Sequence, residues 1–268
     1  MAVGPGAALG GTAAVTAAFP YRLREIAAPR IGLIVLQADE TIEADFRRLI
    51  PPGVELLVSR VPSGAEGTSE TLARMERHLT AAAALFPGSV NFAAVGYACT
   101  SGTAQIGAAE VARLVRAGTT AAAVTDPVTA LIAACRALGL GRLALLSPYV
   151  APVSERLRET LAAAGIDTPA FGSFDVAEEA RVVRIDGPSI IGAAETVAHR
   201  VPVDGLFLSC TNLRTLDVIP VLEDRLGIPV LSSNLVLAWH LLRLAGVAMP
   251  DAPPVRLIDQ TARKPLRS

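Results

Sequence analysis

The chain has 268 residues, enough for one large domain or two medium ones with a substantial buried core. Its net charge of −1 and its 18% of charged residues give no basic surface of the kind that binds nucleic acid. The apolar runs are too short to span a bilayer, and the three cysteines follow no disulfide pattern. We therefore expect a cytoplasmic protein that has neither nucleic acid nor a membrane as its partner.

The predicted elements begin after residue 28. Residues 1–28 are rich in alanine and glycine and do not have the form of a signal peptide, so we expect a flexible tail. Further on, apolar runs alternate with helical patterns; in chain order the runs are RIGLIVLQ, VELLVSRVP, FAAVGYACT, TAAAVT, RLALLSPY, DGLFLSCT and PVLSS. Near-continuous apolar strands separated by helices are typical of parallel sheets covered on both faces. The predicted fold class is therefore α/β.

Two of these runs end in the same dipeptide, which indicates an internal repeat. Cys99 and Cys210 are each followed by threonine and lie 111 residues apart, and the runs that begin at Arg30 and Arg142 are offset by 112 residues. In open α/β sheets, ligands bind at the carboxyl ends of the strands. Each half of a duplicated fold would therefore bring one thiol to a shared site.

The repeat predicts two similar parallel-sheet α/β halves related by a pseudo-two-fold axis. We assign residues 29–122 and 236–268 to the first half and residues 123–235 to the second. The active site is expected between the halves.

Small polar residues follow each of the two cysteines. Backbone N–H groups at such a helix start bind carboxylates, and they lower the pKa of a nearby thiol from about 8.5. A single free cysteine is more often buried and inert, but two Cys-Thr pairs at equivalent points of a repeat favour chemistry. Cys135 lies within a helical pattern and is interpreted as a core residue. The sequence contains no metal-ligand spacing, no phosphate-binding glycine loop and no GxSxG motif, so we expect no metal and no nucleotide.

The motifs GYACTSGT, LLSPYV, FLSCTN and LQADETIEADF resemble the aspartate/glutamate racemase superfamily, in particular its branch of maleate cis–trans isomerases and arylmalonate decarboxylases. Within that branch, VPSG, SCTNLRTLDVIP and LSSNLVLAWH resemble racemase-like proteins of ectoine utilisation. The resemblance implies a cofactor-independent enzyme in which two thiols flank a small carboxylate. It also implies a homo-oligomer.

The resemblance leaves three reactions open. In racemases one thiolate removes the α-proton and the opposite thiol delivers another, whereas in the isomerases a thiolate adds to an alkene. In the decarboxylases one cysteine, matching Cys210, protonates an enediolate, and glycine is common at the position of Cys99. Because this chain has both thiols, we favour a racemase or isomerase of an amino acid or derivative, such as one from ectoine breakdown. A maleate-type isomerase, a decarboxylase and a non-catalytic carboxylate-binding protein are the alternatives.

The resemblance also implies roles for several other residues. Thr100 and Ser101 would hold one carboxylate, helped by the backbone amides of Cys210 and Thr211. Tyr149 matches the tyrosine that donates a hydrogen bond to the substrate carboxylate or enediolate.

Asp39 occupies a position where the isomerases typically have asparagine. Its charge would repel a dicarboxylate, attract an ammonium group and allow it to act as a base toward the neighbouring thiol; alternatively, it caps the following helix. Asn212 would orient Cys210 or complete the carboxylate site. Arg181 and Arg184 could reach a distal carboxylate, although surface charge is the simpler interpretation.

Overall fold

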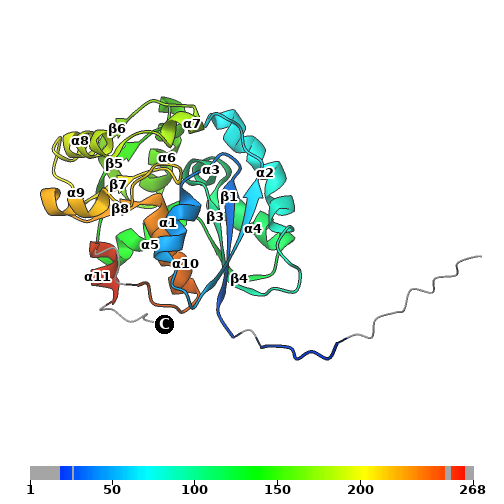
Figure 1. Ribbon diagram of the computed structural model, residues 1–268. Helices are drawn as coiled ribbons and strands as arrows, with labels where there is room; N and C mark the ends of the chain where they lie inside the picture. Colours follow the sequence, from blue (N-terminus) through cyan, green and yellow to red (C-terminus); the bar gives the residue numbers. More distant parts are fainter. Residues whose placement is uncertain (1–18, 26, 251–254, 263–268) are drawn as a thin grey trace, which may run out of the picture.

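The computed structural model describes residues 19–25, 27–250 and 255–262, and most of the predicted tail, residues 1–28, lies outside them. The described part contains two four-stranded sheets, each purely parallel and each covered by helices (Figure 1). The predicted α/β class with two similar parallel-sheet halves is therefore confirmed. No helix in the described ranges is both long and apolar enough to cross a membrane.

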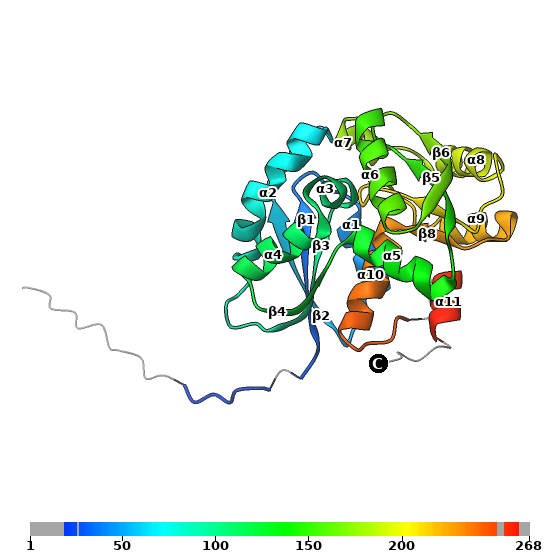
Figure 2. The same cartoon turned by 180° about the vertical axis from the view of Figure 1, so that it is seen from behind.

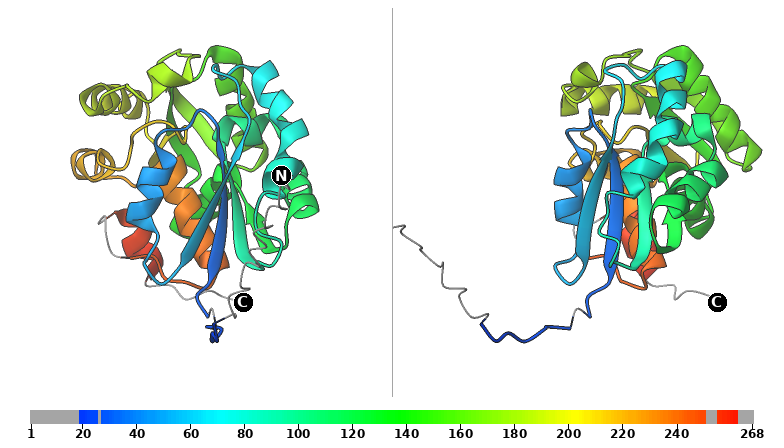
Figure 3. Two further views of the ribbon diagram at one scale, coloured as in Figure 1. Left: turned by 45° about the vertical axis from the view of Figure 1, so that its right-hand side comes forward. Right: turned by 90° about the vertical axis from the view of Figure 1, so that its right-hand side faces the viewer.

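The first sheet has the strand order β2-β1-β3-β4. Its strands are β1 (Arg30–Leu36), β2 (Glu55–Val61), β3 (Phe92–Ala98) and β4 (Ala121–Thr125). The helices between them are α1 (Ile42–Leu49), α2 (Ser69–Ala83), α3 (Thr100–Ile106) and α4 (Ala108–Gly118). Helices α2 and α4 cover one face of this sheet and α1 lies on the other (Figure 3).

The second sheet has the order β6-β5-β7-β8, which repeats the topology of the first. Its strands are β5 (Arg142–Ser147), β6 (Asp167–Ser173), β7 (Gly205–Leu208) and β8 (Val230–Ser232). The helices of this part are α5 (Pro127–Leu138), α6 (Ala151–Ala163), α7 (Glu179–Val182), α8 (Gly187–Ala198), α9 (Ile219–Leu226), α10 (Ser233–Leu244) and α11 (Arg256–Ala262). Helix α6 packs against β6, and α8 packs against β5 and β6.

Two helices join the halves. Helix α5 leads from the first sheet to the second, and α10, which follows β8, returns to pack against α5 and β3 (Figures 1 and 2). The chain therefore comes back to the first sheet after leaving the second. The predicted domain boundaries near residues 122 and 236 stay a prediction.

The continuous apolar runs form the central strands, where both faces of the sheets are buried, whereas the edge strands β2 and β6 keep exposed residues. In β1, Leu33, Ile34 and Val35 are all fully inaccessible to solvent, as is the whole of Leu206–Leu208 in β7. A residue in such a strand has no solvent-facing side, so the polar–apolar alternation of a half-exposed strand is absent. The strands β3 and β7 hold the same place in the two sheets, and Cys99 and Cys210 follow them at their carboxyl ends.

Candidate active site

The first thiol lies at the turn from β3 into α3, which we call the Cys99 corner (residues 97–102). Cys99 is the N-cap of α3, and its Sγ accepts a hydrogen bond from the Gly102 amide at 3.1 Å. The Ser101 hydroxyl lies 3.6 Å from the same sulfur. The cysteine side chain thus takes the place of the serine or threonine that usually caps a helix.

A buried tyrosine supports this thiol from the side of β3. The Tyr97 hydroxyl hydrogen-bonds with Cys99 and lies 3.8 Å from the Met75 sulfur. A Cβ atom at position 102 would be 2.5 Å from the Tyr97 oxygen and 2.9 Å from the Cys99 sulfur. Gly102 is therefore needed for the hydroxyl and the thiol to meet.

The second thiol follows β7 in a turn that we call the Cys210 corner (residues 209–212). Cys210 has a φ of 104°, a conformation that costs a residue other than glycine about 1–3 kcal/mol. Its backbone N–H donates to the Ser233 hydroxyl at 3.0 Å, and the amide of Asn212 hydrogen-bonds with its sulfur. A non-glycine residue at such a φ points to a functional constraint. In this conformation the Cys210 sulfur hydrogen-bonds with Tyr149.

Tyr149, which follows β5, is the tyrosine that contacts the Cys210 corner. Its hydroxyl accepts a hydrogen bond from Ser209 at 3.3 Å and hydrogen-bonds with the Cys210 thiol. The pKa of Tyr149 is raised, mainly by burial and further by the proximity of Cys210 and Cys99. Its hydroxyl therefore stays protonated and able to donate at neutral pH.

Direct hydrogen bonds join the two corners. The Thr211 hydroxyl donates to the carbonyl of Ala98 at 3.3 Å, and the Thr100 hydroxyl donates to the Ser233 hydroxyl at 2.7 Å. Since Ser233 also receives the Cys210 N–H, one hydroxyl links both corners. The sequence-predicted residues from the two halves thus converge in one place.

Burial governs the ionisation of both thiols. It raises the pKa of Cys99 to about 12, outweighing the hydrogen bonds from Ser101 and Gly102 that lower it. The pKa of Cys210 is raised by burial and also by the nearby Glu179 carboxylate. The expectation of acidic thiols at helix starts is therefore wrong for the ligand-free protein: local amides act in the expected direction, but desolvation is the larger effect.

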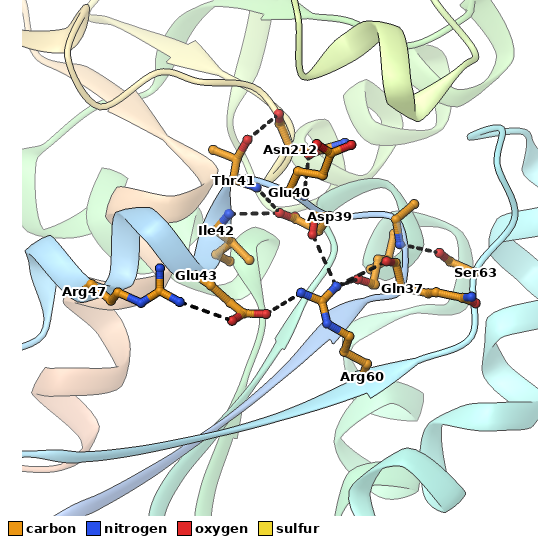
Figure 4. A network of polar contacts seen from close by, with 12 residues as sticks. Gln37, Asp39, Glu40, Thr41, Ile42, Glu43, Arg47, Arg60, Ser63 and Asn212 are labelled. Atoms are coloured by element: carbon orange, nitrogen blue, oxygen red, sulfur yellow. Dashed lines mark hydrogen bonds and ion pairs between the residues drawn. The ribbon is translucent and has the colours of Figure 1, made fainter.

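Asp39 lies between the end of β1 and the start of α1. Its Oδ1 accepts hydrogen bonds from the amides of Thr41 and Ile42, both at 2.8 Å, so it anchors the start of the helix (Figure 4). Its Oδ2 is buried and has no hydrogen-bond partner in the described part of the chain. Burial raises the pKa of Asp39, and the two amides, the Thr211 hydroxyl and the charge of Arg60 only partly offset this. Asp39 thus anchors the start of α1 with its Oδ1, while its Oδ2 accepts no direct hydrogen bond from the described residues.

The amide of Asn212 faces the β1–α1 turn, away from the Cys210 sulfur. Its Oδ1 accepts from the amide of Glu40 at 2.9 Å (Figure 4). Its Nδ2 donates to the Glu179 Oε2 at 2.9 Å. The hydroxyl of Thr41 donates to the Asn212 carbonyl at 2.9 Å. The side chain of Asn212 therefore positions Glu179, and only its backbone amide reaches Cys210.

Glu179 is the site residue that sequence reasoning missed. Short backbone pairing carries it there: the Gly67 amide donates to the carbonyl of Ala177 at 2.8 Å, and the Glu179 amide donates to the carbonyl of Ala65 at 3.0 Å. These bonds join the loop after β2 to the start of α7, and so join the two halves. Nothing in the local sequence separates Glu179 from its neighbour Glu178, whose side chain is exposed.

Other residues considered from the sequence lie elsewhere. Cys135 is buried in α5, as expected for a core residue. Arg181 is exposed and pairs with Glu178 at 3.9 Å, and Arg184 is exposed as well. His240 of α10 hydrogen-bonds with the Thr125 hydroxyl at 2.8 Å.

Comparison with known proteins places this geometry in a family. The sequence model described as arylmalonate decarboxylase matches residues 93–257, which include both thiol corners. The chain belongs to the arylmalonate decarboxylase family. It is 32% identical to arylmalonate decarboxylase of Bordetella bronchiseptica, over 89% of this chain and all of that protein. It is 29% identical to maleate isomerase of Nocardia farcinica, over 83% of this chain and 93% of that protein.

Solved structures of family members show the same architecture. A liganded double mutant of arylmalonate decarboxylase, with a glycine-to-cysteine and a cysteine-to-serine exchange, has a TM-score of 0.78 at 30% identity and covers 87% of this chain and all of that one. A cysteine-to-serine mutant of Nocardia farcinica maleate cis–trans isomerase, with a covalently bound succinylcysteine intermediate, has a TM-score of 0.75 at 28% identity. It covers 87% of this chain and 99% of that one. These relatives are thus enzymes with the same fold, and both mutants carry an exchange at a cysteine.

Proposed function

We propose that this chain is a cofactor-independent two-cysteine racemase or isomerase of a small carboxylate, an amino acid or derivative. The observation that carries the proposal is the meeting of two cysteine corners from the two halves, joined through Ser233 and sharing Tyr149 as a neighbour. In this reaction one thiolate removes the α-proton, an enediolate forms, and the opposite thiol delivers a proton to the other face.

The surroundings of the thiols suit this chemistry. Burial, which raises the pKa of Cys99, also makes its thiolate a stronger base toward an α-proton once that thiolate has formed. The side chains of Thr100, Ser101, Thr211 and Tyr149 are all buried around the two corners, and the hydroxyls of Ser101 and Tyr149 lie next to the Cys99 and Cys210 sulfurs. Together with the backbone amides at the corners, they supply donors for a carboxylate whose charge grows as the enediolate forms.

The test is exchange of the α-proton in D₂O, followed by NMR, for a panel of small amino acids and the matching acids without the amino group. Exchange with inversion is expected for at least one amino acid. Cys99→Ser and Cys210→Ser should each stop interconversion of the enantiomers, with Cys135→Ser as the control that leaves it unchanged. A single-serine variant that interconverts both enantiomers at a near-normal rate would exclude the two-base mechanism.

Maleate-type cis–trans isomerisation is the second candidate, because both thiols are present and a maleate isomerase is among the relatives. Loss of maleate, followed by ultraviolet absorbance, separates it from racemisation. If the charge of Asp39 opposes a dicarboxylate, Asp39→Asn should increase this activity. Decarboxylation of an arylmalonate, which would need only Cys210, is tested by release of carbon dioxide.

A non-catalytic carboxylate-binding role predicts different behaviour of the thiols. Catalytic thiols should be protected from alkylation by substrate, whereas cysteines of a binding protein need not be. The link to ectoine, the cytoplasmic location and the homo-oligomeric state rest on the sequence alone and stay predictions.

A further inference from the structure

We propose that Asp39 and Glu179 form a cation-selective wall beside the two thiols, so that the substrate is a small carboxylate that also carries a positively charged nitrogen. Once bound, this positive charge would promote ionisation of the cysteines. The inference rests on the proposed function and deepens it, because it assigns the choice of substrate to a residue pair and includes Glu179.

The first observation is the free oxygen of Asp39. The side chain is only 5% exposed, and two backbone amides fix its Oδ1. Its Oδ2 is buried and accepts no direct hydrogen bond within the described ranges; the nearby Thr211 hydroxyl lowers the pKa of Asp39 but donates to the carbonyl of Ala98. A buried carboxylate oxygen without a partner is costly, which indicates that a donor from a ligand completes it.

The second observation is that Glu179 is held next to Asp39 from the opposite half of the molecule. Asn212 donates to Glu179 with its Nδ2 and accepts from Glu40 with its Oδ1, so one amide clamps the glutamate onto the turn that contains Asp39. Each carboxylate contributes to raising the pKa of Cys210, and Glu179 does so for Cys99 as well. Glu179 therefore lies near both thiols, and Asp39 lies near Cys210.

The third observation is the lack of a balancing charge. No ion pair to Asp39 or Glu179 is formed within residues 19–25, 27–250 and 255–262. Arg60 is near enough to act on Asp39, but its guanidinium donates to the carbonyls of Leu36, Gln37 and Asp39 and pairs with Glu43 (Figure 4). A substrate cation would supply the missing charge, whereas a second carboxylate would add repulsion.

The same electrostatics couple binding to reactivity. In the ligand-free protein the two carboxylates oppose a negative charge on the Cys210 sulfur, and Glu179 also opposes one on the Cys99 sulfur. A bound ammonium group between them would cancel this effect and favour the thiolate. The thiols would then become reactive only when a substrate of the right charge is present, which limits side reactions of the free enzyme.

The experiment measures charge preference directly at the thiols. Aminoethyl methanethiosulfonate is cationic and sulfonatoethyl methanethiosulfonate is anionic, and both are small thiol reagents. Their rates at Cys99 and Cys210 are measured by peptide mass spectrometry and divided by their rates with free cysteine. We expect a corrected cation-to-anion ratio of about 10 or more at one or both site cysteines.

Matched variants assign this preference to the pair. Glu179→Gln and Asp39→Asn should each lower the ratio at least about threefold, because they remove the charge and keep the shape and the fixed hydrogen bonds. Glu178→Gln removes the same charge one residue away, at an exposed side chain, and should leave the ratio unchanged.

Three results would overturn the inference. These are a wild-type ratio no higher than that of free cysteine, equal effects of Glu179→Gln and Glu178→Gln, and failure of both reagents to reach either thiol within hours. The exchange assay in D₂O keeps the two proposals apart. Exchange without charge preference rejects this inference alone, whereas charge preference without exchange or turnover of any acid rejects the proposed function alone.

Discussion

The Cys99 corner and the Cys210 corner occupy equivalent places in a duplicated fold, yet they hold their sulfurs in different ways. Cys99 has an ordinary extended backbone, with φ of −151°, and its side chain caps a helix. Cys210 has a φ of 104° and is followed by a turn with no regular helix until α9. The duplication therefore preserves the position of the thiol, while one copy carries backbone strain and the other does not.

The two corners also differ in where the residues that hydrogen-bond to them come from. At the Cys99 corner the sulfur is held by residues of its own corner, Tyr97, Ser101 and Gly102. At the Cys210 corner the backbone depends on distant residues: Ser233 binds the Cys210 N–H, and Asn234 donates to the carbonyl of Thr211 at 2.9 Å. The Cys99 sulfur is thus held mainly within its own corner, whereas the backbone of Cys210 depends on the start of α10.

The largest expected effect comes from exchanging the tyrosine of each corner. Tyr149→Phe should lower the rate of α-proton exchange by about 10²–10³-fold, because it removes a donor to the developing enediolate. It should also slow alkylation of Cys210 by iodoacetamide and spare Cys99. Tyr97→Phe, which changes a hydroxyl near Cys99, should show the reverse order in peptide-resolved alkylation. Equal slowing of both thiols by either variant would contradict the division into two corners.

The second-largest expected effect is a pH dependence of the free energy of unfolding that acts through the Cys210 corner and has no counterpart at the Cys99 corner. Asn234, which supports this corner, also donates to Asp45 Oδ2 at 2.8 Å, and burial raises the pKa of Asp45 from 3.8 to about 6. A raised pKa means that the protonated form favours folding, so this contribution is complete below pH 4 and is lost as the pH rises to about 6. Its size is about 3 kcal/mol, at 1.36 kcal/mol for each unit.

Asp45→Asn tests that expectation. The free energy of unfolding of the wild type, measured by urea denaturation, should fall relative to that of the variant between pH 4 and pH 6. Asp217→Asn, at an exposed partner of Arg48, should follow the wild type. Parallel curves for the wild type and Asp45→Asn would show that this carboxyl group does not link the corner to pH.

The hydroxyl shared by the corners gives a smaller, more selective effect. Ser233→Ala removes the acceptor of the Cys210 N–H and the partner of Thr100, so exchange should slow about tenfold and stability should fall by about 1–2 kcal/mol. Ser232→Ala removes only the N-cap of α10, whose hydroxyl accepts from Leu235. It should cost about 1 kcal/mol of stability and leave the exchange rate unchanged. If both variants slowed exchange alike, Ser233 would have no special place between the corners.

The sequence predicts the duplicated sheets well because their cause is local and repeated. Fully buried parallel strands require continuous apolar runs, and the offset between Cys99 and Cys210 marks the same point in each half. The β3–α3 turn is likewise predictable, since small polar residues after Cys99 are those that begin helices. Each of these features is set by residues close together in the chain.

The electrostatics of the site could not be predicted in the same way. Whether a thiol becomes more or less acidic depends on how deeply it is buried, which is settled by the packing of both halves. Glu179 reaches the site through backbone pairing with the loop around Ala65, far away in sequence. The φ of Cys210 depends on Ser233 and Asn234, which belong to another helix. These are tertiary effects, and the backbone effects among them act at the Cys210 corner.

The smallest expected effect tests the backbone strain that the positive φ of Cys210 implies. At position 210, glycine adopts a positive φ without penalty and alanine does not, so Cys210→Gly should be more stable than Cys210→Ala by about 1 kcal/mol. Position 135 is the control: it lies inside α5, where glycine should be less stable than alanine by about 1 kcal/mol. Urea denaturation of the four variants gives both differences. A glycine that destabilises position 210 as it does position 135 would mean that the turn relaxes to a negative φ, and the contrast between the two corners would then lie in their hydrogen bonds alone.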